Sequence, residues 1–115
     1  MANINKRPIV IQDLIAHATN ISLENLDASD RFLYSAEATF NVIAQFPAIG
    51  KLSNFSHPQL TQVRQYQIKW FTKYIIFYQI QSPETVEILR VLHGAQDLEF
   101  TLTPCLLYTS PSPRD

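Results

Sequence analysis

Cysteine is nearly absent from this chain of 115 residues, because Cys105 is the single one. One cysteine excludes an internal disulfide framework and a cysteine-based metal site. No apolar run approaches the roughly 20 residues that a membrane span needs, and the N-terminus lacks the apolar core of a secretory signal. These absences predict a cytoplasmic protein that does not enter the membrane, with one domain and one modest core.

An excess of either charge is also missing, since the formal net charge is −1. The charges are unevenly spread, so that residues 1–50 are mildly acidic and residues 51–94 are mildly basic. This imbalance is too weak for direct sequence-specific nucleic-acid binding, which normally requires a strongly basic patch. It suits a surface that meets an acidic partner.

The end of the chain, Cys105–Asp115, reads CLLYTSPSPRD. Its composition is that of a disordered Pro/Ser-rich tail. The codons that spell this peptide also resemble a sequencing adapter translated in frame. We therefore expect residues 1–103 to form a single domain and residues 104–115 to be a disordered, artefactual tail, with the native C-terminus lost after about residue 102.

The N-terminal part of the chain predicts a short strand at Asn3–Lys6 and a first helix. Pro8 suits the first helical position, where its missing N–H costs nothing. A strand over Pro8–Ile11 is the competing interpretation, because β-branched residues favour strands. The helix is preferred because its apolar spacing continues through Ile11, Leu14, Ile15 and Ala18.

A second helix begins after Asn25, whose side chain suits an N-cap, and ends before Pro47 and Gly50. Its apolar stripe comprises Phe32, Leu33, Ala36, Phe40, Ile43 and Phe46. Only a few residues separate the two helices, which predicts an antiparallel helical hairpin. The segment Lys51–Leu60 has turn-forming residues and no apolar period, and it is predicted to be a loop.

From Val63 onward the apolar period changes to two, which is typical of strands. The expected strands are Val63–Trp70, Tyr74–Gln81 and Val86–His93, joined by turns at Thr72-Lys73 and Ser82-Pro83-Glu84. The predicted fold class is therefore α+β, in the order β-α-α-β-β-β, with the helical hairpin packed on a small, mainly antiparallel sheet.

The last two expected strands carry apolar side chains on both faces, although two helices can cover only one face. Strands of this kind are normally covered on both sides. Either the segment after His93 folds back over the second face, or another protein covers it.

The stretch Val86–Asp97 places one arginine inside an apolar strand and one histidine at its exit. Arg90 is interpreted either as part of a structural ion pair, with Glu84, Glu87 or Asp97, or as a contact to a phosphate or carboxylate. His93 is interpreted as a strand-end residue or, alternatively, as a general acid or base. His17 and His57 look like isolated surface or loop positions, and no metal or cofactor site is expected.

The order of elements and several motifs resemble the ParE branch of the RelE/ParE toxin superfamily over Arg7–Leu102. These motifs are Asp13-Leu14, Phe46-Pro47 with Gly50, Arg64, Ile76-Phe77-Tyr78 and, above all, the run from Ile88 to Gly94, ILRVLHG. The chain departs from the family pattern at Asn20, where an aromatic residue is common, and at Gln96, where a second arginine is common.

This resemblance implies the toxin component of a bacterial type II toxin–antitoxin system. Proteins of this branch commonly inhibit DNA gyrase and are neutralised by a ParD-like antitoxin that wraps over the toxin. The alternative from the same superfamily is a RelE-like, ribosome-dependent mRNA endonuclease. A third possibility is a non-toxic relative that is retained as a binding module.

The first hypothesis needs no catalytic residue and predicts a partner-binding surface. Its candidates are Tyr66, Trp70, Phe77, Tyr78, Arg90 and His93. The endonuclease hypothesis needs acid, base and cationic groups clustered around a phosphate. Its candidates are Arg64, Lys69, Lys73, Tyr78, Arg90 and His93. Such enzymes are usually strongly basic, so the weak charge favours the first hypothesis.

Overall fold

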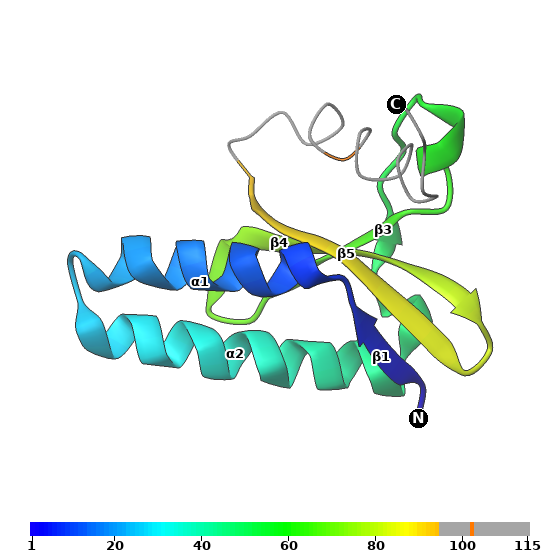
Figure 1. Ribbon diagram of the computed structural model, residues 1–115. Coiled ribbons are helices and arrows are strands. Elements are labelled where there is room, and N and C mark those ends of the chain that lie inside the picture. The colour runs from blue at the N-terminus through cyan, green and yellow to red at the C-terminus, as the bar shows by residue number, and fades with distance from the viewer. Residues whose placement is uncertain (95–101, 103–115) are drawn as a thin grey trace.

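The computed structural model describes residues 1–94 and 102, and it has the predicted α+β architecture. Two long helices lie side by side and cover one face of a five-stranded sheet (Figure 1). The elements are β1 (Asn3–Lys6), α1 (Pro8–Ser22), α2 (Leu26–Gln45), β2 (Lys51–Leu52), β3 (Arg64–Ile68), β4 (Phe71–Ser82) and β5 (Thr85–His93). The predictions for Gln96, Asp97 and the tail from residue 104 lie outside the described residues.

The two helices begin where the sequence signals them. Pro8 occupies the first turn of α1, so the competing strand at Pro8–Ile11 is wrong. The Asn25 side chain caps α2 by accepting a hydrogen bond from the Ala28 backbone N–H at 3.0 Å. Neither described helix combines the length and apolar character that crossing a bilayer requires.

The sheet has the strand order β1-β5-β4-β3-β2. β1 pairs with β5 in parallel, and the other pairs are antiparallel, which confirms a mainly antiparallel sheet. The segment predicted as a loop at Lys51–Leu60 contains the short edge strand β2 and a 3₁₀ turn, η2 (Pro58–Leu60). A two-residue strand carries too few side chains to show a period of two, so the pattern could not predict it.

The turn between β3 and β4 lies at Lys69 and Trp70, so the predicted turn at Thr72-Lys73 is wrong. Thr72 and Lys73 belong to β4 instead. The ring of Phe71 packs edge-on against that of Phe32 of α2, with 5.4 Å between their centroids. Packing of Phe71 on the helical hairpin accounts for the earlier start of β4 and leaves Trp70 in the turn.

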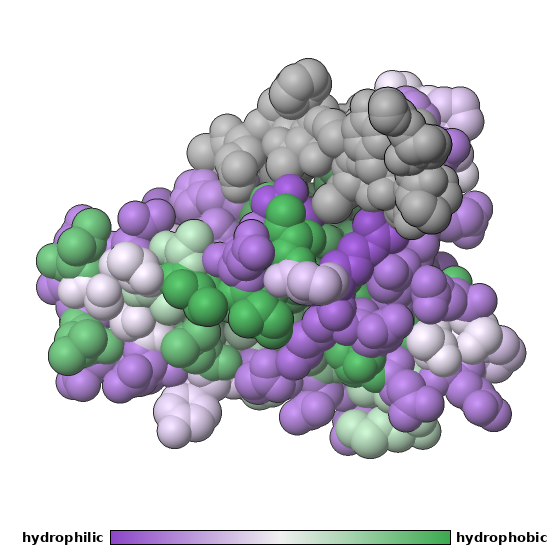
Figure 2. Space-filling model, viewed as in Figure 1, coloured by the Kyte–Doolittle hydropathy of each residue, from purple (hydrophilic) through white to green (hydrophobic). Residues whose placement is uncertain are grey.

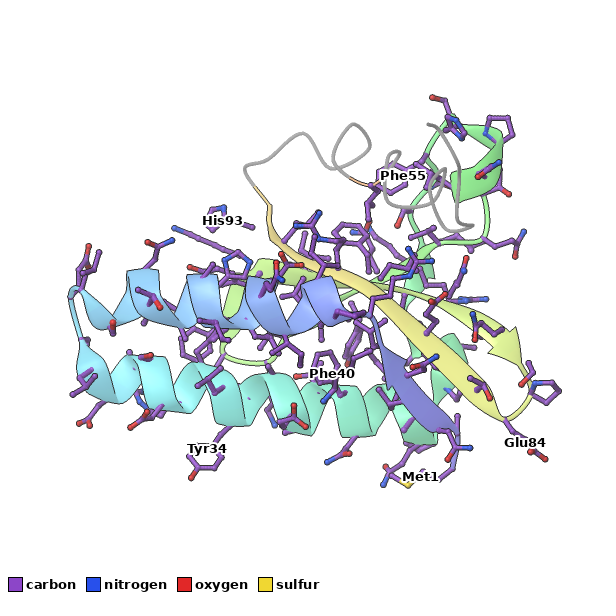
Figure 3. The ribbon with its side chains drawn as sticks, viewed as in Figure 1. Met1, Tyr34, Phe40, Phe55, Glu84 and His93 are labelled. Atoms are coloured by element: carbon purple, nitrogen blue, oxygen red, sulfur yellow. The ribbon has the colours of Figure 1, made fainter. Side chains whose placement is uncertain are left out.

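Separate clusters of buried residues lie on the two faces of the sheet. Figure 3 shows Phe40 on the side of the helices and Phe55 on the opposite side. The helical side buries Val10, Leu14, Ala18, Phe32, Ala36, Phe40, Ile43, Ile68, Ile76, Tyr78, Val86, Ile88 and Val91. The opposite side buries Leu60, Val63, Phe77, Leu89, Leu92 and Leu102, with Phe55 and Ile75 packed against them.

The second face is thus covered from within the chain, by the segment that precedes β3 and by Leu102. The return of Leu102, which follows His93, bears out one of the two explanations for the two-sided apolar strands. Parts of the predicted helical stripes face outward instead, because Ile11, Ile15, Leu33 and Phe46 are exposed.

Candidate functional site

Arg90 forms an ion pair with Asp13, which lies in α1 and is separated from it by most of the chain. The Arg90 Nε and Nη2 atoms donate to the two carboxylate oxygens of Asp13 at 2.8 and 2.7 Å. Both side chains are largely buried, at 16% and 10% exposure. The interpretation of Arg90 as an ion-pair residue holds, with Asp13 as a partner that the sequence did not suggest. Of the partners it did suggest, Glu87 pairs with Arg7 at 2.9 Å, and Asp97 lies outside the described residues.

β5 contains a bulge next to Arg90. The pairing with β4 passes from Phe77–Arg90 to Tyr78–Ile88, so Leu89 is an extra residue on β5. Ile88 and Val91 consequently both reach the helical side, whereas Leu89 reaches the opposite side. The extra residue breaks the strict alternation of β5.

α1 covers the edge of β5 where β1 no longer does. β1 ends at Lys6, opposite Ile88, so the backbone of Val91 lies beyond its reach. The Val91 N–H donates to Asp13 Oδ2 at 3.1 Å, and the Val91 carbonyl lies 2.8 Å from His17 Nε2. Because a carbonyl can only accept, His17 Nε2 carries the proton. We call Asp13, His17 and Arg90 the α1–β5 seam.

His17 is therefore not the isolated surface residue that the sequence suggested. Its ring is half-buried and lies edge-on to those of Tyr74 and Phe32, with centroid distances of 4.9 and 6.2 Å. His93 is also half-buried and lies edge-on to Tyr74 at 5.1 Å. Tyr74 thus contacts one histidine from a helix and one from the last strand.

Tyr78 fastens the segment after α2 to the sheet. Its buried hydroxyl donates to the Pro47 carbonyl at 2.7 Å and accepts from the Gly50 N–H at 2.8 Å. Burial raises the pKa of the Tyr78 phenol, and the Gly50 hydrogen bond and the Arg64 charge oppose this shift. A Cβ on Gly50 would lie 2.5 Å from the Tyr78 oxygen, so only glycine fits there.

Arg64 completes this fastening, because its Nη1 donates to the Gly50 carbonyl at 2.7 Å. The contacts join four residues of the sequence pattern, which are Pro47, Gly50, Arg64 and Tyr78. They hold one piece of backbone against the central strands.

The candidate endonuclease residues do not gather at one place. Arg64 and Tyr78 are paired across β3 and β4, whereas His93 pairs with Tyr74. Four residues of strand separate Tyr74 from Tyr78, which is roughly 13 Å. The exposed Lys73 precedes Tyr74 and therefore points to the opposite face. Within residues 1–94 and 102, no group of three His, Cys, Asp or Glu side chains could hold a metal ion.

The candidate partner-binding residues divide into buried and exposed sets. Phe77 and Tyr78 are fully buried, one on each side of the sheet, so they cannot present their rings to a partner. This part of the sequence prediction needs correction, because packing on both faces encloses the middle of β4. Tyr66 packs against the helical core and is half-buried, whereas Trp70 is 79% exposed.

Apolar side chains also remain exposed on the outer face of α1. Ile11 and Ile15 lie one turn apart and are 46% and 60% exposed. Figure 2 shows apolar side chains gathered over α1 on this face of the molecule. We call this surface the α1 stripe; the sequence pattern had shown only that both residues recur at helical spacing.

Comparisons with known proteins found one matching family model and similar solved structures. The model of a family described as the ParE toxin of the type II toxin–antitoxin system, parDE, matches residues 5–98. Among solved structures, the chain is similar to one from a chromosomal ParDE toxin–antitoxin system of P. aeruginosa. The TM-score is 0.65 at 14% identity, covering 81% of this chain and 96% of that one. No curated protein sequence matches.

Proposed function

This chain belongs to the ParE toxin family of type II toxin–antitoxin systems, and from this premise we propose that it inhibits DNA gyrase and thereby blocks replication. It acts by binding, in the cytoplasm, and a ParD-like antitoxin neutralises it. We expect this activity to require no cofactor.

The observation that best supports this proposal is the ion pair between Arg90 and Asp13. A cation that stabilises charge on a scissile phosphate must be free to contact that phosphate. The Arg90 guanidinium instead makes a two-pronged contact with Asp13, and Tyr78 and Arg64 are engaged with the backbone of Pro47 and Gly50. Because these three side chains are engaged in contacts that hold the fold, they support inhibition by binding over cleavage of RNA.

The α1 stripe supports an antitoxin partner. Ile11 and Ile15 form an apolar strip of one helix face, which suits an amphipathic helix laid alongside it. We propose that the antitoxin covers this stripe. Its contacts extend to His93, which ends β5, the strand on which α1 packs, and is half-buried. Tyr66 lies on β3, which packs with α2, and is left outside this surface.

Purified gyrase provides the test. Increasing amounts of the 115-residue chain are added to a supercoiling reaction, and relaxation by topoisomerase I at the same toxin concentrations serves as the control. We expect gyrase to lose supercoiling activity while topoisomerase I is unaffected. A parallel reaction on translating ribosomes measures cleavage of mRNA. Ribosome-dependent cleavage with unchanged gyrase would contradict the proposal and favour the RelE-like alternative.

A further inference from the structure

The turn between β3 and β4 presents Trp70 in an unusual way. Its backbone φ is 71°, in the left-handed region that large side chains rarely adopt, and its side chain is 79% exposed. The Lys69 ammonium lies 5.3 Å from the centre of the indole ring. Neither core packing nor backbone preference accounts for a tryptophan here, and strained residues of this kind cluster at functional sites.

The turn is attached to α2 by a hydrogen bond and a ring contact. The Lys69 backbone N–H donates to the Thr39 hydroxyl at 3.3 Å, and that hydroxyl donates to the Ser35 carbonyl at 2.7 Å. Phe71, on the other side of Trp70, packs edge-on against Phe32. The residues on both sides of Trp70 are thus held before any partner arrives, which lowers the entropic cost of ordering the turn on binding.

A hollow of about 480 Å³ lies between this turn and α2. Its lining consists of Ala28, Arg31, Tyr34, Ser35, Trp70 and Phe71. The Tyr34 side chain is 79% exposed and points away from α1 (Figure 3). Tryptophan, tyrosine and arginine are the residue types that dominate binding energy at protein interfaces. We call this surface the Trp70 platform.

The hollow itself carries the positive charge of Arg31, whereas the carboxylates of Asp30 and Glu37 line a separate hollow on Tyr34. Within residues 1–94 and 102, Arg31 makes no ion pair, and the described residues that line the hollow carry no carboxylate. Lys69 adds a second cation beside the indole. The complementary ligand is therefore a protein segment that inserts an apolar side chain between Tyr34 and Trp70 and places a carboxylate against Arg31.

We propose that the Trp70 platform is the surface with which the toxin holds its target protein. This inference rests on the proposed function and deepens it, because it assigns target binding to the α2 side of the molecule. The α1 stripe is left to the antitoxin. One toxin would then offer separate surfaces to the protein that it inhibits and to the protein that neutralises it.

Growth arrest and gyrase inhibition test this assignment with matched variants of the full chain. Trp70→Asn removes the indole and suits the left-handed backbone, Tyr34→Ala removes the facing ring, and Arg31→Glu reverses the charge. Phe46→Ala is the control, because Phe46 is also an exposed aromatic residue, 61% exposed, and lies roughly 18 Å along α2 from Tyr34.

Loss of a central contact residue should raise the toxin concentration for half-inhibition by about tenfold or more. We expect this loss for Trp70→Asn, Tyr34→Ala and Arg31→Glu, with growth restored on expression, and a change below about twofold for Phe46→Ala. The Tm of Trp70→Asn should be no lower than that of the wild type, which separates lost binding from lost folding.

Three results would overturn the inference. Wild-type inhibition by Trp70→Asn, with folded protein verified, would exclude the platform while leaving gyrase inhibition intact. Equal losses in Phe46→Ala would show that any exposed aromatic residue matters. A wild-type chain that neither arrests growth nor inhibits gyrase would overturn the proposed function together with the platform. Growth arrest without gyrase inhibition has a different consequence. If Trp70→Asn abolished that arrest, the platform would be retained and only gyrase would be rejected as its target.

Discussion

The α1–β5 seam and the Trp70 platform use polar and aromatic side chains in opposite ways. In the seam, Asp13 and Arg90 are largely buried and satisfy one another and the edge of β5. On the platform, Trp70 and Tyr34 are exposed, and Trp70 has a strained backbone. Asp13 and Arg90 of the seam belong to the motifs that make the sequence resemble its family, whereas Trp70 and Tyr34 lie outside them. The motif residues Asp13 and Arg90 hold the fold, whereas Trp70 and Tyr34 are available for contacts with a partner.

The largest expected effect comes from breaking the seam. Asp13→Ala leaves a mostly buried Arg90 guanidinium and the Val91 N–H without their shared partner. Removing one member of a buried ion pair costs about 3–5 kcal/mol. The free energy of unfolding, measured by urea denaturation, should fall by this amount.

The matched control for the seam is a surface pair. Lys6 and Glu37 are 2.9 Å apart, but Glu37 is 59% exposed, so Glu37→Ala should cost less than about 1 kcal/mol. Equal costs for Asp13→Ala and Glu37→Ala would remove the distinction between a structural seam and ordinary surface charge.

An intermediate effect is expected at Tyr78. Tyr78→Phe leaves the Pro47 carbonyl and the Gly50 N–H without their common partner, at a cost of about 1–3 kcal/mol at neutral pH. Because burial raises the phenol pKa in the folded state, the neutral form contributes stability below the unfolded pKa near 10. That contribution is lost as the pH rises through the raised folded pKa.

Denaturation at several pH values tests whether this contribution to stability is lost as the pH rises. The stability difference between the wild type and Tyr78→Phe should be constant up to about pH 9 and shrink above about pH 10. A stability difference that grows with pH would contradict the prediction that Tyr78 is buried as a neutral phenol.

The smallest effect on stability is expected on the platform. Trp70→Asn relieves a left-handed conformation that costs an ordinary residue about 1–2 kcal/mol, and it removes few packing contacts. Thermal unfolding should therefore show an unchanged or slightly raised Tm. A clear loss of stability would mean that Trp70 is a structural residue, and the contrast with the seam would disappear.

The sequence predicted the elements with long, regular patterns and missed those decided by tertiary packing. Apolar spacing located α1, α2 and β5, because these segments are long enough to show a period. The position of the β3–β4 turn depends on the packing of Phe71 against Phe32, which no local pattern contains. The period of two that begins at Val63 placed Trp70 in a strand.

The candidate site was predicted in part. Trp70 was named as a partner-binding residue, but Tyr34 and Arg31 were not. Tyr34 lies outside the buried stripe of α2, and this position could have been read from the sequence. The pairing of Arg90 with Asp13 joins residues 77 positions apart, and no spacing rule connects them. A bulge at Leu89 also changes which face each residue of β5 meets, and it cannot be seen before the strands are paired.

The most direct test of inhibition by binding is the topology of a reporter plasmid in cells that express the 115-residue chain. Inhibition of gyrase predicts that growth stops and that the plasmid topoisomers shift from negatively supercoiled toward relaxed forms. Growth arrest with an unchanged topoisomer distribution would contradict it.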